Sequence, residues 1–300
     1  MTREEGLARR AISVAIGLAV MLSHGMAAQQ KVPVVLNHLM IVLDSATYHD
    51  VRNSPLMLGQ FARADTGFLL GYEAGPGIRL MGKYNYLMLA APSPSRGAQV
   101  GDAAIVLATT RAGDLARLTR QGEFREVGVI SIQADGSPRP LEYTDNIRRS
   151  GPGGIDRLSE RVELAFMEYS AEAARARAQV DSLPESNLAG SRFLAPFFDS
   201  QRLFVQLTGA TLAFPVDDIA KIVRVLERDA VTVIPEGEGA IIKLDGFTLR
   251  LIPSFVGAGV KELQFALTRT ALGNPIYQFG PKSQLRFGPG PIAVWSFKWP

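Results

Sequence analysis

The chain of 300 residues contains no cysteine, and this absence excludes several kinds of structure and chemistry. Disulfides cannot stabilise the fold, so any folded part must rely on burial and hydrogen bonding. A thiol nucleophile, a thiolate metal centre and a lipid-modified N-terminal cysteine are also excluded. The sequence further lacks a Gly-x-Ser-x-Gly elbow and a His-Glu-x-x-His helix, the signatures of many serine hydrolases and zinc proteases.

Net charge is also small. The 32 basic and 29 acidic residues leave a formal net charge of +3, and the basic residues are scattered along the chain. We therefore predict no nucleic-acid surface. The hydrophobic share of 47% and the charged share of 20% are those of an ordinary globular protein. At this length a sizeable core can form, and both one large domain and two modules remain open.

The one long apolar run lies near the N-terminus. Arg9 and Arg10 precede the uncharged run 11–22, and short polar and small residues follow up to Ala28. A bilayer core needs about 20 apolar residues, so this run is too short to span it but suits a secretory signal. We predict a signal peptide over residues 1–28, export to the periplasm or the cell exterior, and no stable membrane insertion after cleavage. An uncleaved anchor is the alternative.

The apolar pattern after the signal predicts strands and short helices in a recurring order. Val34 to Leu43 is a strand, Asp44 or Ser45 caps a short helix, and three strands follow before residue 91. A second segment with the same order runs from Ala103 to Tyr169. A third begins near Leu203 and contains Asp245-Gly246, a signal for a type I′ hairpin.

This order predicts an α+β fold built from repeated strand–helix–three-strand units. We expect paired units over residues 33–180 and a third strand–helix–strands unit over residues 203–300, packed on the first. Residues 171–180 have strong helix propensity. The tail alternates, with Trp295, Phe297 and Trp299 on one face, which favours a core or edge-strand position over a ligand platform.

Four sequence stretches carry a family resemblance. They are LNHLMIVLDSATYHDVRNSP (36–55), FMEYS (166–170), FPVDDIAKI (214–222) and FGPKSQLRFG (279–288). They resemble a bacterial family of unknown function that is similar to the glyoxalase-like, or vicinal-oxygen-chelate, superfamily. The resemblance covers roughly residues 33 to 299. It implies that the units curl into half-open β-barrels with a ligand cavity.

The resemblance also implies a possible divalent metal, because the superfamily holds one with His and Glu on inward-facing strands. His38 matches the first-strand ligand position. Met88 stands where the fourth-strand carboxylate is expected, whereas Glu168 on the last strand of the second unit could face the cavity. A metal site of His38 and Glu168 is therefore an incomplete set, because catalytic sites normally have three or more protein ligands.

The candidate ligand-binding residues are His38, Tyr48, Met88, Glu168 and Tyr169. Each also has a structural explanation: His38 as a core histidine held by Asn37, Glu168 as the partner of an arginine, and the tyrosines as core side chains. Three functions follow from these candidates. The first is binding of a small, partly apolar molecule. The alternatives are a divalent-metal-dependent lyase, isomerase or dioxygenase, and an interaction protein that docks a partner through its aromatic edge. Oligomeric state stays open.

Overall fold

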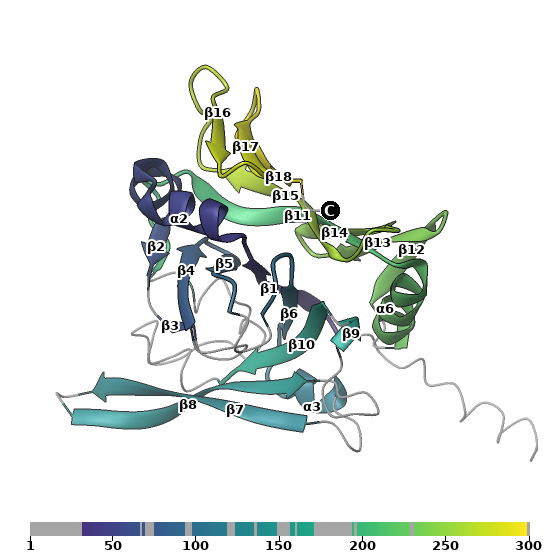
Figure 1. Ribbon diagram of the computed structural model, residues 1–300. Coiled ribbons are helices and arrows are strands. Elements are labelled where there is room, and N and C mark those ends of the chain that lie inside the picture. Colours follow the sequence, from purple (N-terminus) through teal and green to yellow (C-terminus); the bar gives the residue numbers. More distant parts are fainter. Residues whose placement is uncertain are drawn as a thin grey trace, which may run out of the picture. The chain divides into compact units, whose positions relative to one another are not determined.

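The structure is a computed structural model that describes most of the chain from Val32 onward. The described ranges are 32–66, 68–69, 75–93, 98–118, 124–134, 137–148, 157–159, 161–170, 194, 197–228 and 231–298. They form mostly β-sheet with few helices, in one sheet of ten strands and one of eight (Figure 1). The predicted signal peptide and the predicted helix at 171–180 lie outside the described residues.

The ten-stranded sheet is built from the first half of the chain. Its main path runs β2-β4-β5-β1-β6-β10-β8-β7, while β3 pairs with β4 and β9 with β10. The strands are β1 (Val34–Val42), β2 (Arg63–Asp65), β3 (Phe68–Leu69), β4 (Gly75–Met81), β5 (Tyr86–Ala90), β6 (Ala103–Thr109), β7 (Phe124–Ala134), β8 (Ser137–Arg148), β9 (Arg157–Ser159) and β10 (Val162–Tyr169). The helices are α2 (Ser45–Asn53), the π-helix η1 (Met57–Phe61) and α3 (Asp114–Leu118). Parallel pairs join β1 to β5 and β6 to β10, and an antiparallel pair joins β1 to β6.

The eight-stranded sheet is built from the second half of the chain. Its order is β12-β13-β14-β11-β15-β18-β17-β16. The elements are β11 (Phe204–Phe214), α6 (Val216–Arg228), β12 (Thr232–Glu236), β13 (Gly239–Leu244), β14 (Phe247–Pro253), β15 (Gly259–Leu267), β16 (Ile276–Phe279), β17 (Ser283–Phe287) and β18 (Ile292–Phe297). β11 pairs parallel with β14, whereas β15 pairs antiparallel with β18. A parallel pair needs a crossover connection, and α6 supplies one after β11. Only the loop 268–275 separates β15 from β16.

Local sequence explains where these elements begin and end. Asp44 caps α2, because Thr47 N donates to its carboxylate at 3.0 Å. The acidic residues of the first turn of α6 favour the positive end of its dipole. The β13–β14 hairpin forms at the predicted position, with Gly246 at φ +69°. Asp245 has no positive φ, so the turn is not the predicted type I′.

Buried aromatic rings and one amide join the two sheets. Phe61 of η1 stacks on Phe204 of β11 at 5.6 Å between ring centroids and meets Phe265 of β15 edge-on at 5.4 Å. The Asn85 side chain bonds both backbone groups of Leu207, donating to the carbonyl at 3.0 Å and accepting from N–H at 2.8 Å. Because Asn85 is buried, these bonds satisfy polar atoms that water does not reach.

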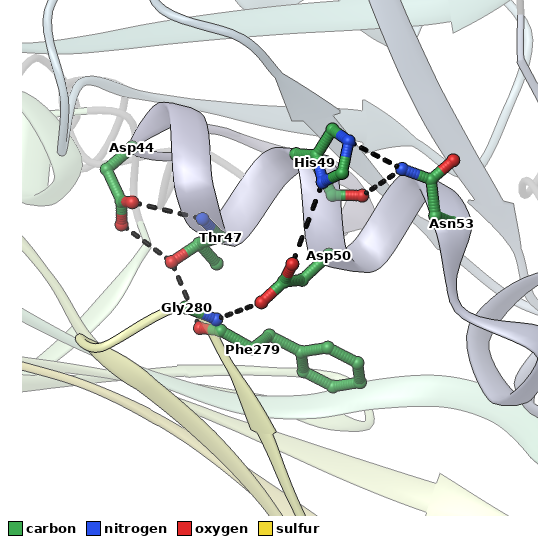
Figure 2. Close-up of polar contacts among 7 residues, drawn as sticks. All are labelled: Asp44, Thr47, His49, Asp50, Asn53, Phe279 and Gly280. Carbon is green, nitrogen blue, oxygen red and sulfur yellow. Dashed lines mark hydrogen bonds and ion pairs between the residues drawn. The ribbon is translucent and has the colours of Figure 1, made fainter.

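A second junction links α2 to the turn between β16 and β17 (Figure 2). The Thr47 hydroxyl lies 2.6 Å from an Asp44 carboxylate oxygen and 3.1 Å from the Phe279 carbonyl oxygen. Gly280 N donates to the Asp50 carboxylate at 2.7 Å. Gly280 has φ +61°, and a Cβ at this position would lie 2.7 Å from the Thr47 hydroxyl oxygen. The junction therefore requires glycine both for its backbone conformation and for the close approach.

Some sequence predictions are corrected or refined by these elements. Strand is more dominant than the predicted α+β fold implied. The described residues form no closed barrel, and the prediction was of half-open barrels. Trp295 and Phe297 are core side chains, 0% and 4% exposed, and so offer no exposed aromatic edge. Trp299 lies outside the described residues. Within the described ranges, no helix is both long and apolar enough to cross a membrane.

Candidate functional site

A β-bulge in β1 places two neighbouring polar side chains on one face of the ten-stranded sheet. The pairing of β1 with β6 shifts register between Leu36 and His38, so Asn37 is the extra residue. Leu36 and Leu39 belong to the main core cluster on one face of the sheet. A bulge re-aims side chains locally, and here Asn37 and His38 are hydrogen-bonded to each other on the other face.

We call that other face the His38 face. Residues that oppose each other in paired strands share a face, and side chains alternate along each strand. His38 opposes Tyr86 on one side and Val106 on the other, and Met40 opposes Met88 and Ala104. The His38 face comprises Val35, Asn37, His38, Met40, Arg63, Asp65, Arg79, Met81, Tyr86, Met88, Ala104, Val106, Ala108, Glu163, Ala165, Met167 and Tyr169.

A chain of hydrogen bonds runs across the His38 face from β10 to the imidazole. Asn37 Nδ2 donates to the Tyr169 hydroxyl at 2.8 Å, and Asn37 Oδ1 lies 2.7 Å from His38 Nδ1. Because the amide oxygen can only accept, His38 Nδ1 carries the proton in this arrangement. The other ring nitrogen, Nε2, then has a free lone pair. It has no hydrogen-bond partner among the described residues.

The surroundings of His38 keep its ring uncharged. Burial, and to a smaller extent the positive charge of Arg79, lower the pKa of His38 from 6.5 to about 3. The His38 ring stacks on Tyr86 at 4.5 Å between centroids, with 20° between the planes. The stack and the Asn37 bond together fix both the plane of the imidazole and the direction of Nε2.

The remaining side chains of the His38 face are mostly apolar, with a few charged side chains among them. Met40 and Met88 pack with Ala104 in one cluster, and Met81 and Met167 belong to the neighbouring one. Methionine side chains adapt to irregular shapes. The guanidinium of Arg79 is bound at 2.7 Å to the carboxylate of Asp65, its cross-strand neighbour on β2, and Glu163 is buried on β10.

The structure does not bring all five predicted site residues together. His38, Met88 and Tyr169 share the His38 face. Glu168 lies on the opposite face, because it follows Leu164 and Phe166 in the alternation of β10. Tyr48 of α2 packs into the main core on that side as well, where its buried hydroxyl has no partner among the described residues.

Glu168 has a structural role at the start of α3. Its carboxylate accepts hydrogen bonds from the Thr109 hydroxyl at 2.9 Å, from Gly113 N at 2.8 Å and from Leu115 N at 2.9 Å. Two of these donors are backbone N–H groups at a helix N-terminus, where a negative charge is favourable. No arginine is needed as its partner. The pairing of Glu168 with His38 in one metal site is therefore replaced by a role in anchoring α3.

One comparison with known proteins decides the family. A family model described as a family of unknown function, DUF5829, matches residues 36–297. The chain belongs to the DUF5829 family. None of the curated proteins matches this DUF5829 chain.

Solved structures similar to the DUF5829 chain are distant. One is a hypothetical protein from Staphylococcus aureus, 11% identical at a TM-score of 0.47, with 74% of this chain and 87% of that chain covered. Another is a xylose isomerase-like TIM barrel/4-hydroxyphenylpyruvate dioxygenase fusion protein, 14% identical at 0.42, with 80% and 38% covered. A variant of homoprotocatechuate 2,3-dioxygenase from Brevibacterium fuscum is 12% identical at 0.36, with 80% and 58% covered. The chain thus spans less than two thirds of both dioxygenase chains.

The described donors of this DUF5829 chain do not complete a metal centre of the kind that the family resemblance implied. His38 Nε2 has the free lone pair and the second hydrogen-bonded nitrogen typical of a metal ligand. However, the predicted carboxylate of Glu168 faces away from it. Among the described residues no three His, Asp or Glu side chains gather closely enough to hold a metal ion.

Sequence reasoning missed several polar members of this site. Arg79, Tyr86 and Glu163 all lie on the His38 face, opposite or beside residues that were predicted. For Glu163 a signal was present, because it shares its parity along β10 with Tyr169 whereas Glu168 does not. For Arg79 and Tyr86 the signal required the pairing of β4, β5 and β1, which the sequence alone does not specify.

Proposed function

We propose that this DUF5829 chain is an exported, glyoxalase-like protein that binds a small, partly apolar molecule on the His38 face. The observation that carries the proposal is the bulge at Asn37. It gathers an oriented neutral histidine, two tyrosines and several methionines on one side of the sheet, away from the main core. Ligand sites generally combine an apolar lining with a few placed polar groups.

The glyoxalase-like architecture is supported by the order of strand pairing. In three segments a strand is followed by a helix, and that first strand pairs in parallel with a later strand of the same segment. The pairs are β1 with β5, β6 with β10, and β11 with β14. In each case the later strand continues antiparallel into its next neighbour. We infer that these segments are repeats of one unit and that the strands from β15 onward form a fourth copy without its helix.

The second candidate function is a divalent-metal-dependent lyase, isomerase or dioxygenase. One observation favours it: Asn37 holds His38 as the partner of a metal-bound histidine would hold it. The described residues supply too few further donors, so this candidate ranks second. The metal content of the purified protein distinguishes the binding protein from the metal-dependent enzyme.

The test combines metal analysis with a binding screen. The protein, purified without chelator or added metal, is examined by elemental analysis, and a set of uncharged aromatic and aliphatic fragments is screened by saturation-transfer NMR. We expect fragments to bind, the binding to be lost in His38→Ala, and the binding to persist in the matched control Glu168→Gln, which changes the opposite face.

Two results would decide against the proposal. If no fragment binds, or if Glu168→Gln abolishes binding while His38→Ala leaves it intact, the His38 face is not the ligand site. If about one divalent metal per chain is found and His38→Ala removes it, the metal-dependent enzyme replaces the binding protein.

A further inference from the structure

The His38 face also defines the kind of ligand, an inference that rests on the proposed function. We infer that His38 accepts, through Nε2, a hydrogen bond from the hydroxyl group of an uncharged alcohol or phenol, and that Asn37 is the positioning residue that makes Nε2 the acceptor.

The first step is the direction of the hydrogen-bond chain. Asn37 is 0% exposed, so its amide has no water to satisfy it and depends on its two partners. With Nδ2 donating to the Tyr169 hydroxyl, Oδ1 is left to accept from His38 Nδ1–H. The ring therefore presents an acceptor, not a donor, at Nε2, and a matching ligand group must carry a proton.

The second step concerns ligand charge. An anionic ligand would need a free cation, but the guanidinium of Arg79 is already bound to Asp65 at 2.7 Å. A charge of either sign would also lose hydration among Met40, Met88 and the alanines of the face, which costs far more than burying a neutral hydroxyl that finds a partner.

The third step is the apolar body of the ligand. The methionines of the His38 face offer polarizable surface that packs well against rings and branched chains. The Tyr86 ring covers one side of the imidazole at 4.5 Å. A ligand hydroxyl must therefore approach Nε2 along the ring edge, with its carbon skeleton lying over the methionines.

The tautomer can be read directly. Long-range ¹⁵N–¹H NMR of the imidazoles distinguishes a protonated from an unprotonated ring nitrogen, and the chain has only three histidines. We expect His38 to show Nδ1–H and a bare Nε2. Asn37→Ala should lose this preference and Asn37→Asp, which keeps the acceptor, should retain it. If wild-type His38 instead shows Nε2–H, the Asn37 amide is reversed and the inference is overturned, while ligand binding as such still stands.

The ligand class is tested with three matched probes. Phenol carries the hydroxyl, anisole has the same ring with the proton replaced by methyl, and benzoate carries a negative charge. We expect phenol to bind at least fivefold more tightly than anisole or benzoate, and Asn37→Ala to reduce the preference for phenol below twofold. His49→Gln, on the exposed surface of α2, is the control and should leave the preference unchanged.

Each other outcome counts against the inference. Equal binding of phenol and anisole would show that the ligand donates no hydrogen bond to Nε2 and that the His38 face is only an apolar site. Tighter binding of benzoate shows that the face recognises anions. Absence of binding by all three probes at 10 mM overturns the ligand class, and the fragment screen then shows independently whether the face binds any small molecule.

Discussion

Acidification should destabilise this protein through His38 in a way that can be calculated. In the folded chain burial and Arg79 hold the pKa of His38 at about 3, against 6.5 for an unperturbed histidine. Below about pH 6.5 His38 is therefore protonated in the unfolded chain but stays neutral in the folded chain. The free energy of unfolding contributed by His38 is fully present above this pH and is lost as the pH falls toward 3.

The magnitude follows from proton linkage. Between about pH 7.5 and pH 5, the unfolded histidine becomes almost fully protonated while folded His38 stays neutral. The free energy of unfolding falls by RT times the logarithm of the ratio of the unfolded-state proton-binding terms at the two pH values. This amounts to about 2 kcal/mol, with a limiting slope of about 1.4 kcal/mol per pH unit. Because folded His38 binds almost no proton anywhere in this window, the loss is nearly the same for any folded pKa below about 4.

The assay is urea unfolding at both pH values for the wild type and for His38→Phe, which keeps a ring to stack on Tyr86. We expect the free energy of unfolding to fall by about 2 kcal/mol more in the wild type than in the variant, because the carboxylates common to both cancel. His49→Gln, whose side chain is 76% exposed in the wild type, is the control and should behave like the wild type. Parallel pH dependence of wild type and His38→Phe would show that His38 takes up its proton equally in the folded and the unfolded chain.

A direct titration covers the case in which His38→Phe does not fold. The imidazole C–H resonance of His38 in the folded wild type should not shift between pH 8 and pH 5. A midpoint near pH 6 would show that the ring is solvated and charged at mild acidity.

Three further predictions concern stability. Gly280→Ala should lower the free energy of unfolding by about 3 kcal/mol or more in urea unfolding, because it adds a clash with α2 to the cost of φ +61°. The control Gly237→Ala, with φ +60° and open space around it, should cost about 1 to 2 kcal/mol. Equal losses in the two variants would show that the clash at Gly280 is absent. Asn85→Ala should cost about 2 to 4 kcal/mol by the same assay, since two buried backbone groups of β11 lose their partner, whereas the exposed Asn53→Ala should stay within about 0.5 kcal/mol. Glu168→Gln should cost about 1 to 3 kcal/mol yet leave phenol affinity within twofold; a larger change in affinity would restore Glu168 to the ligand site.

Much of the local structure could be predicted because it depends on neighbouring residues. The strand predicted over Val34 to Leu43 is found as Val34–Val42, and the hairpin around Asp245-Gly246 is confirmed. The bond between Asn37 and His38 was also anticipated and is confirmed. Element lengths were less predictable: β11 runs over 11 residues, Phe204–Phe214, because its pairing with β15 extends it.

The candidate site was harder to predict because it depends on register between distant strands. A bulge forms only where two strands pair, so the sequence of β1 alone does not indicate that Asn37 and His38 share a face. Glu168 is the instructive case. Its acidic side chain in an apolar run suggested a functional carboxylate, but its partners are backbone groups of α3 that the sequence does not place. Alternation along β10 already separated Glu168 from Tyr169.

The most direct test of the His38 face as the ligand site is the methionine-methyl NMR spectrum of the ¹³C-labelled protein with and without phenol. The chain has eight methionines, and Met→Leu variants assign their signals. Phenol should shift the signals of Met40 and Met88 and leave in place that of Met57, which is fully buried in the core of the opposite face. A shift confined to Met57, or no shift at saturating phenol, would show that the His38 face is not the ligand site.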